Sequence, residues 1–132
     1  MNSKKITGWI FLTSGIMMLI GVMGQIQDFI PRLLKVTEDI EPYMRNRIFL
    51  MEYLFLLGFG ANGILAICIS RGLTKGERRV WGLAFIPTFY MLIMAILIPI
   101  FTPRDWMHSL IYTLPFGLAM LISLILYYKN IK

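Results

Sequence analysis

The chain has 132 residues, of which 58% are hydrophobic, and its mean hydropathy is +0.71. Its single cysteine, Cys68, excludes an internal disulfide and paired-cysteine redox chemistry within one chain. The formal charge of +6 is better explained by membrane topology and anionic lipid than by nucleic acid, so we expect no nucleic-acid partner.

Four long apolar runs fill most of the sequence, and the second contains the one charged residue found within them, Glu52. Each run is close to the ~20 residues that cross ~30 Å of hydrocarbon, and lipid forces the backbone to satisfy its own hydrogen bonds. We therefore predict an all-α fold, an integral membrane four-helix bundle that forms a single transmembrane domain over residues 1–132. Its helices are expected at about residues 6–24, 42–71, 75–101 and 103–128.

The first run follows Lys4 and Lys5, as in a signal peptide, but it is longer than a typical signal-peptide core, which favours a retained helix. Gly8, Gly15 and Val22 recur at seven-residue spacing, as do Ser14 and Gly21. This spacing predicts that the small residues allow a neighbouring helix to pack closely.

The loop after the first helix carries apolar residues at helical spacing, beginning with Ile26 and including Leu33 and Leu34. Pro31 suits the first turn of a helix. The pattern predicts a short amphipathic helix at about residues 26–40 that lies in the outer membrane interface.

The second helix is predicted to be two-sided. One arc of about 100° holds all its polar side chains and several small ones, namely Glu52, Phe55, Phe59, Asn62, Gly63 and Ala66. Because lipid offers an acid or amide no partner, this arc should face protein. Gly72 is expected to cap the helix, and Thr74 and Glu77 match a capping box that would begin the third helix.

The third helix has a stripe of small inward residues, Ala84, Thr88 and Ala95. A kink at Pro87 would free backbone carbonyls that must find partners inside the bundle.

The fourth helix is expected to begin with a cap at Thr102 and to end in an interfacial aromatic pair, Tyr127 and Tyr128. Its predicted inward arc contains His108, Tyr112, Pro115, Phe116, Ala119 and Ser123.

The basic residues are unevenly divided between the two sides of a four-pass chain. Eight lie at the termini and in the second loop, and five lie in the first and third loops. Because Lys and Arg favour the cytoplasm, we predict a multi-pass protein of the cell (plasma) membrane with both termini cytoplasmic.

Glu52 is the first candidate for chemistry, as an acid that would bind a cation, carry a proton or hold a substrate amine. The favoured alternative pairs it with one of three arginines, Arg45, Arg47 or Arg104. Asn62 is either a ligand contact or, by preference, the donor of an interhelical hydrogen bond.

His108 is predicted at a depth similar to that of Glu52, where the two would form a proton-sensitive pair, although an ordinary interfacial histidine is favoured. Thr88 and Tyr112 complete the candidate polar interior. One histidine and one intramembrane acid do not make a metal site, so we expect no metal and no cofactor.

The layout resembles that of the DoxX-like family of small four-helix membrane proteins. The resemblance lies in the long first loop, in Glu52 followed by a glycine-rich stretch at residues 58–63, and in the basic turn at residues 71–79. It implies a small membrane component, such as an accessory subunit, and does not imply an oxidoreductase activity.

Three functions remain open. The first is a non-enzymatic accessory or partner-binding membrane protein, whose partners would be the lipid bilayer and another membrane protein or a second copy of the chain. The second is a small-solute or ion transporter that uses Glu52 and Asn62. The third, ranked last, is a membrane-embedded enzyme that uses Glu52 and His108 on a lipid-soluble substrate.

Overall fold

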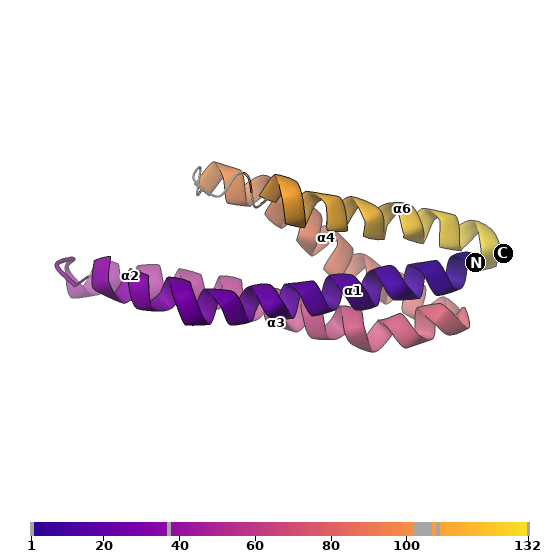
Figure 1. Cartoon of the computed structure of the whole chain (residues 1–132), viewed down its shortest axis with the longest axis horizontal. Helices are drawn as coiled ribbons and strands as arrows, with labels where there is room; N and C mark the ends of the chain where they lie inside the picture. The colour runs from indigo at the N-terminus through magenta and orange to yellow at the C-terminus, as the bar shows by residue number, and fades with distance from the viewer. Residues whose placement is uncertain (1, 37, 102–106, 108, 132) are drawn as a thin grey trace.

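The structure is a computed structural model that describes residues 2–36, 38–101, 107 and 109–131. Helices account for nearly all of these residues (Figure 1). In chain order the elements are α1 (Ser3–Gly24), η1 (Gln25–Phe29), α2 (Ile30–Val36), α3 (Pro42–Lys75), α4 (Arg78–Phe101), η3 (Ser109–Thr113) and α6 (Leu114–Ile131), where η marks a π-helical turn. Within the described ranges, four helices are long and apolar enough to cross a membrane. The all-α, four-helix prediction is therefore confirmed at this level.

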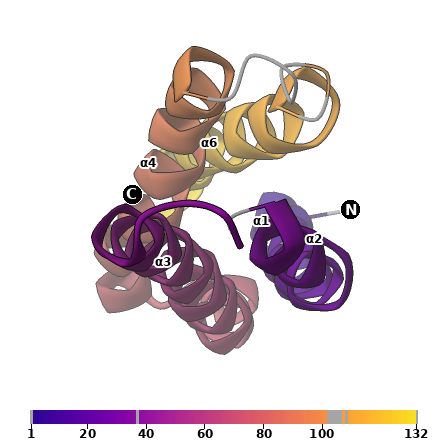
Figure 2. The same cartoon turned by 90° about the vertical axis from the view of Figure 1, so that its left-hand side faces the viewer.

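The helices pack in the cyclic order α3, α1, α6, α4. The most extensive contact joins α1 to α3, while α6 packs on α1 and α4, and α4 also contacts α3. The start of α1 and the end of α6 lie at the same end of the molecule (Figure 1). Viewed from the opposite end, α4 and α6 lie on one side, and α1, α2 and α3 on the other (Figure 2).

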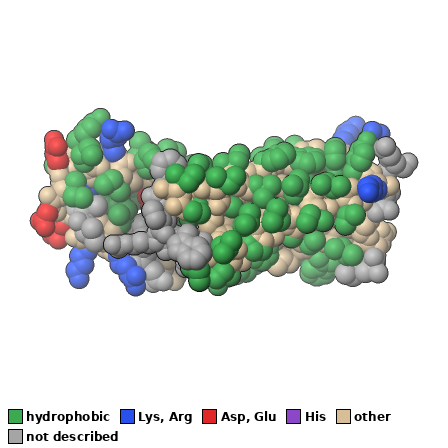
Figure 3. Space-filling model, turned by 90° about the horizontal axis from the view of Figure 1, so that it is seen from above, with side chains coloured by type: hydrophobic (Ala, Val, Ile, Leu, Met, Phe, Trp, Pro, Cys, Tyr) green, Lys and Arg blue, Asp and Glu red, His purple; other side chains and the backbone are tan. Residues whose placement is uncertain are grey.

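Many large apolar side chains are exposed on the outer faces of the helices. Large side chains such as Leu57, Ile64 and Ile96 are 56–69% exposed on the outer faces of α3 and α4. Figure 3 shows hydrophobic side chains along the middle of one face of the molecule and charged side chains at its two ends. This distribution fits helices whose outer surface contacts lipid.

The predicted inward faces of α3 and α4 are largely confirmed. On α3, Gly63 and Ala66 are buried, whereas Ala61 and Ile64 are exposed. On α4, the stripe of Ala84, Thr88 and Ala95 is buried together with Met91.

The predicted close packing at the small residues of α1 is confirmed at Gly8 and Gly15, whereas Gly21 is exposed and a Cβ atom there would meet no atom within 4 Å. A Cβ atom added to Gly15 would lie 2.7 Å from the backbone oxygen of Gly63, and one added to Gly8 would lie 2.8 Å from that of Ser70. The backbones of α1 and α3 can approach this closely only because these positions carry no side chain.

The segment predicted as a separate interfacial helix continues the first helix instead. α1, η1 and α2 form one helical run from Ser3 to Lys35 (Figure 1). In η1, the Ile30 amide donates to the oxygen of Gln25, five residues back. The π-helical turn comes just before Pro31, whose missing amide would interrupt an α-helix, and η3 stands in the same relation to Pro115.

The turn between α3 and α4 differs from the predicted one. α3 continues past Gly72 and Thr74, and it ends at Gly76, which has a φ of 83°. The amide of Glu77 donates to the oxygen of Gly72 (3.0 Å), and that of Gly76 to the oxygen of Leu73 (3.1 Å), as in a Schellman motif. Gly76 ends the helix because a left-handed residue is required there, and Thr74 donates to Ser70 within α3 rather than capping α4.

The inward face of the last helix was predicted correctly only in part: Ser123 is buried and Phe116 packs against the core, as expected. Tyr112 is 49% exposed and Pro115 is exposed, whereas Ser109, Thr113, Gly117 and Met120 are buried. The π-helical turn at η3 changes the direction in which the residues before Pro115 point. In addition, a helix that is apolar on all sides gives no clear pattern from which its inward face can be predicted. Tyr127, expected in an interfacial belt, is fully buried. The predicted cap at Thr102 lies outside the described residues.

Candidate functional site

Glu52 and Asn62 both lie on α3, and both are half-buried. Ten residues separate them, which corresponds to ~15 Å along a helix axis. One small ligand therefore does not contact both side chains at once. If both residues act on a solute, they do so at successive positions along the helix.

An aromatic cluster joins α3 to α4 between these two positions. The hydroxyl of Tyr90 donates to the carbonyl of Phe55 (3.4 Å), and the Phe59 ring meets the Tyr90 ring edge-on at 5.2 Å. The Tyr90 hydroxyl also lies where a side chain on Gly58 would be. Tyr90 is not among the residues predicted from the sequence, although one tyrosine on an apolar helix, beside a stripe of small residues, was a usable signal.

Asn62 does not make the predicted interhelical hydrogen bond. Its amide nitrogen donates to the carbonyl of Gly58, one turn earlier on the same helix, at 2.8 Å. Its Oδ1 atom is buried and has no hydrogen-bond partner among the described residues. Among the candidate residues on α3, the Asn62 Oδ1 atom is the one polar side-chain atom that is buried and has no hydrogen-bond partner in the described part of the chain.

Thr88 and Tyr112 are not brought together in the interior. Thr88 is fully buried, and its hydroxyl donates to the carbonyl of Ala84 (2.7 Å) within α4. Because Tyr112 is 49% exposed, its side chain is not enclosed among the helices. Thr88 therefore has its donor engaged in its own helix, and Tyr112 does not line a closed interior.

Two of the proposed partners of Glu52 can be located. Arg45 is half-buried and Arg47 is exposed, both in the first turns of α3. Arg104 and His108 lie outside the described residues, so the predicted proximity of His108 to Glu52 remains a prediction.

The bundle buries two further hydroxyls that have no hydrogen-bond partner in the described ranges, those of Ser14 and Tyr127. Ser14 lies on α1, and Tyr127 lies on α6 near the end that holds the termini. Ser14, Asn62 and Tyr127 lie on three different helices, so their unpartnered atoms do not form one polar face.

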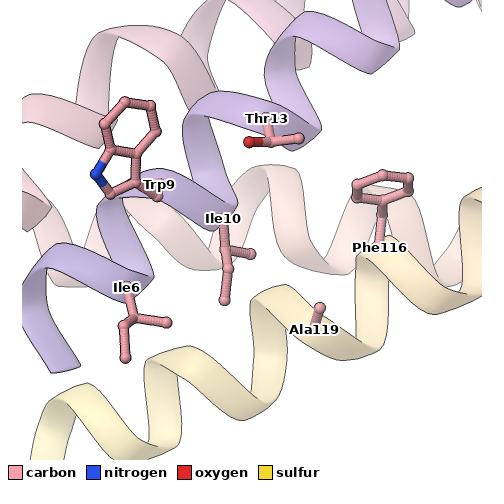
Figure 4. Close-up of a pocket in the computed structure, with 6 residues that line it drawn as sticks. All are labelled: Ile6, Trp9, Ile10, Thr13, Phe116 and Ala119. Atoms are coloured by element: carbon pink, nitrogen blue, oxygen red, sulfur yellow. The ribbon is translucent and has the colours of Figure 1, made fainter. Parts of the chain in front are cut away.

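Two surface hollows among the described residues lie away from the candidate residues. These adjoining hollows, of about 250 and 280 Å³, run between α1 and α6 and share Ile6, Ile10 and Ala119. Figure 4 shows the side chains that line the first of them, including Trp9 and Phe116. Their lining is almost entirely apolar, which suits a hydrocarbon occupant better than a polar substrate.

No group of three or more His, Cys, Asp and Glu side chains that could hold a metal ion occurs among the residues whose structure is described. Comparison with protein-family models, curated proteins and solved structures finds no match for the chain. The resemblance to DoxX-like proteins therefore remains an expectation from the sequence layout.

Proposed function

We propose that the chain is an integral membrane protein with four membrane-spanning helices and that it acts as a non-enzymatic accessory component that binds a partner protein. The four long apolar helices and the exposed leucine and isoleucine side chains on their outer faces support the membrane location. The plasma membrane is the proposed site.

Charge supports an orientation with both termini in the cytoplasm. Lys4, Lys5 and Lys129 lie at the ends of the chain, close to the basic turn between α3 and α4. This end carries an excess of basic side chains, as cytoplasmic ends do.

The partner-binding role rests on one observation, which is that α2 and the start of α3 extend beyond the other helices (Figure 1). The 34 residues of α3 extend ~51 Å as a helix, whereas the 24 residues of α4 extend ~36 Å. The hairpin of α2 and the start of α3 therefore projects past the described ends of α4 and η3 (Figure 1). With the basic end at one membrane surface, this projection would stand outside ~30 Å of hydrocarbon.

The projecting hairpin, residues 30–50, exposes large apolar side chains among its charges. Leu34 is 54%, Tyr43 is 65% and Met44 is 48% exposed. Glu38, Asp39 and Glu41 are also exposed between them. Apolar side chains that are exposed above the hydrocarbon and rimmed by charges are typical of a protein-binding surface.

Site-specific photo-crosslinking in the native membrane tests this role. A photoreactive residue at Tyr43 is expected to form one discrete protein adduct, and the same residue at Ile96 on the outer face of α4 is expected to label lipid. The added substitution Met44→Glu should abolish the adduct while the protein still accumulates in the membrane. Lipid labelling alone at both positions would contradict a partner-binding role.

A second function, transport of a small solute or ion, is favoured by the buried, unpartnered Oδ1 of Asn62 on the same helix as Glu52. The test is Glu52→Gln, which keeps the shape of the side chain and removes its charge. If the chain is a transporter, the Glu52→Gln variant should lose most of its uptake or proton coupling while it still assembles. Loss of assembly without a specific transport defect would count against this function.

A further inference from the structure

The two hollows between α1 and α6 form one furrow, which we call the α1–α6 groove. Its walls are exposed apolar side chains, with Ile6 and Trp9 on α1 and Ile122 and Leu126 on α6. Thr7 and Ser123, at its base, are 1% and 5% exposed. The groove is therefore open on its outer side and closed toward the bundle.

The base of the groove offers little to a polar ligand. The Thr7 hydroxyl donates to the carbonyls of Ser3 (2.9 Å) and Ser123 (3.2 Å), and the Ser123 hydroxyl donates to that of Met120 (2.8 Å). With these donors engaged, the occupant that fits the groove is a hydrocarbon chain. Ala119 keeps the groove deep because a larger side chain at this position would fill it.

The length of the groove matches one leaflet of a bilayer. It runs from Ser3 to Thr13 on α1, ten residues or ~15 Å along the helix, which is half of the ~30 Å of hydrocarbon. An acyl chain of the leaflet at the termini would lie along this path.

The end of the groove at Ser3 and Leu126 is flanked by positive charge. Lys5 lies four residues before Trp9, a wall residue on α1, and Lys129 lies three residues after Leu126 on α6. Residues three or four apart share one side of a helix, so both lysines lie on the groove side. Both lysines are exposed. At the opposite end of the bundle, Arg32 and Lys35 are accompanied by the exposed acids of residues 38–41.

We propose that the α1–α6 groove binds one anionic glycerophospholipid, with an acyl chain along the groove and the phosphate beside Lys5 and Lys129. The charge of the lysines selects the headgroup, and the apolar walls hold the chain. This proposal rests on the proposed membrane location but does not depend on the partner-binding role.

Photolabelling in vesicles tests the proposal. The whole chain is reconstituted in phosphatidylcholine with a trace of phosphatidylglycerol or phosphatidylcholine that carries a diazirine on the acyl chain, and the adducts are mapped by mass spectrometry. The phosphatidylglycerol probe should label residues 3–13 and 116–126 severalfold more than the phosphatidylcholine probe does. The double variant Lys5→Gln/Lys129→Gln should abolish this preference, a loss of about fivefold, which is the equivalent of ~1 kcal/mol.

Matched variants separate a built site from general contact with lipid. Ala119→Leu should reduce labelling of both segments severalfold, whereas Ala61→Leu on the exposed face of α3 should leave it unchanged. Arg32→Gln/Lys35→Gln, which removes the same charge from the other end, should also leave the preference unchanged. Circular dichroism and a single elution peak establish that each variant folds.

Three results would overturn the proposal. One is equal labelling of the groove by the two probes, and another is an effect of Ala119→Leu no larger than that of Ala61→Leu. The third is absence of adducts from α1 and α6 while other helices are labelled, which would show that another helix covers the groove. Labelling of no helix by either probe would instead contradict the membrane location.

Discussion

The hydroxyl of Ser109 donates to the carbonyl of Ala95 over 2.6 Å, and this is the carbonyl that Pro99 leaves without its helical donor. In an α-helix the oxygen of residue 95 accepts from the amide of residue 99, but proline has no amide hydrogen. A side chain from η3 thus supplies the hydrogen bond that α4 lacks. From the sequence, such partners were expected for carbonyls freed by a kink at Pro87, and the structure shows one at Pro99.

Ser109→Ala is expected to destabilise the fold by about 1–2 kcal/mol, because it leaves a buried carbonyl without a donor. The measurement is the free energy of unfolding in mixed micelles. Ser123→Ala is the matched control because, among the described residues, the Ser123 hydroxyl bonds within its own helix (to Met120, 2.8 Å), and a smaller loss is expected there.

A double-mutant cycle makes the assignment specific. Pro99→Ala restores an amide at position 99, so Ser109→Ala should cost much less in that background than in the wild-type chain. Equal costs in the two backgrounds would mean that Ser109 stabilises α4 by some means other than the carbonyl of Ala95.

Gly15→Leu is expected to disrupt the packing of α1 on α3. The new Cβ would lie 2.7 Å from the backbone oxygen of Gly63, and overpacking of this kind costs about 1–3 kcal/mol or more. Gly21→Leu, on the same helix, is the control, because a Cβ there meets no atom within 4 Å. Thermal unfolding of the two variants side by side should separate them, and similar losses would contradict the close contact.

Much of the fold was predictable because four long apolar runs leave a chain few alternatives to long helices. The four helices follow from the length and composition of these runs, and the inward faces of α3 and α4 follow from their small and polar residues, such as Gly63 and Thr88. On α1, the seven-residue spacing of Gly8 and Gly15 indicated a close helix contact, and the structure shows that the neighbour is α3. On each of these helices most side chains are large and apolar, and a small or polar residue marks the side that faces protein.

The predictions that failed depended on local backbone geometry. Two glycines, Gly72 and Gly76, were available to end α3, and composition alone does not say which one adopts a left-handed φ. The phase of the last helix depends on the π-helical turn before Pro115, and an extrapolation at 100° per residue does not include such a turn. Tyr112 was therefore placed inside, whereas Ser109 and Thr113 occupy the interior.

Asn62→Leu is expected to change the free energy of unfolding by less than about 1 kcal/mol. The Asn62 side chain bonds only to the carbonyl of Gly58 in its own helix, and the substitution also removes a buried acceptor that has no partner in the described residues. Unfolding of this variant alongside Asn62→Gln measures the effect. A stable Asn62→Leu protein that lost transport would assign the amide to function, whereas a large destabilisation would assign it a structural role.

The orientation of the chain can be tested with cysteines at its two ends. In a Cys68→Ser background, Asp39→Cys should react with a membrane-impermeant maleimide added to intact cells, and Lys75→Cys should react only after the membrane is permeabilised. Both positions are exposed, so their accessibility differs only in the side of the membrane on which they lie. The expectation follows from the excess of basic residues around Lys75, which favours the cytoplasm. Labelling of position 75 but not of position 39 in intact cells would reverse the orientation and place the projecting hairpin in the cytoplasm, where a partner would have to be sought instead.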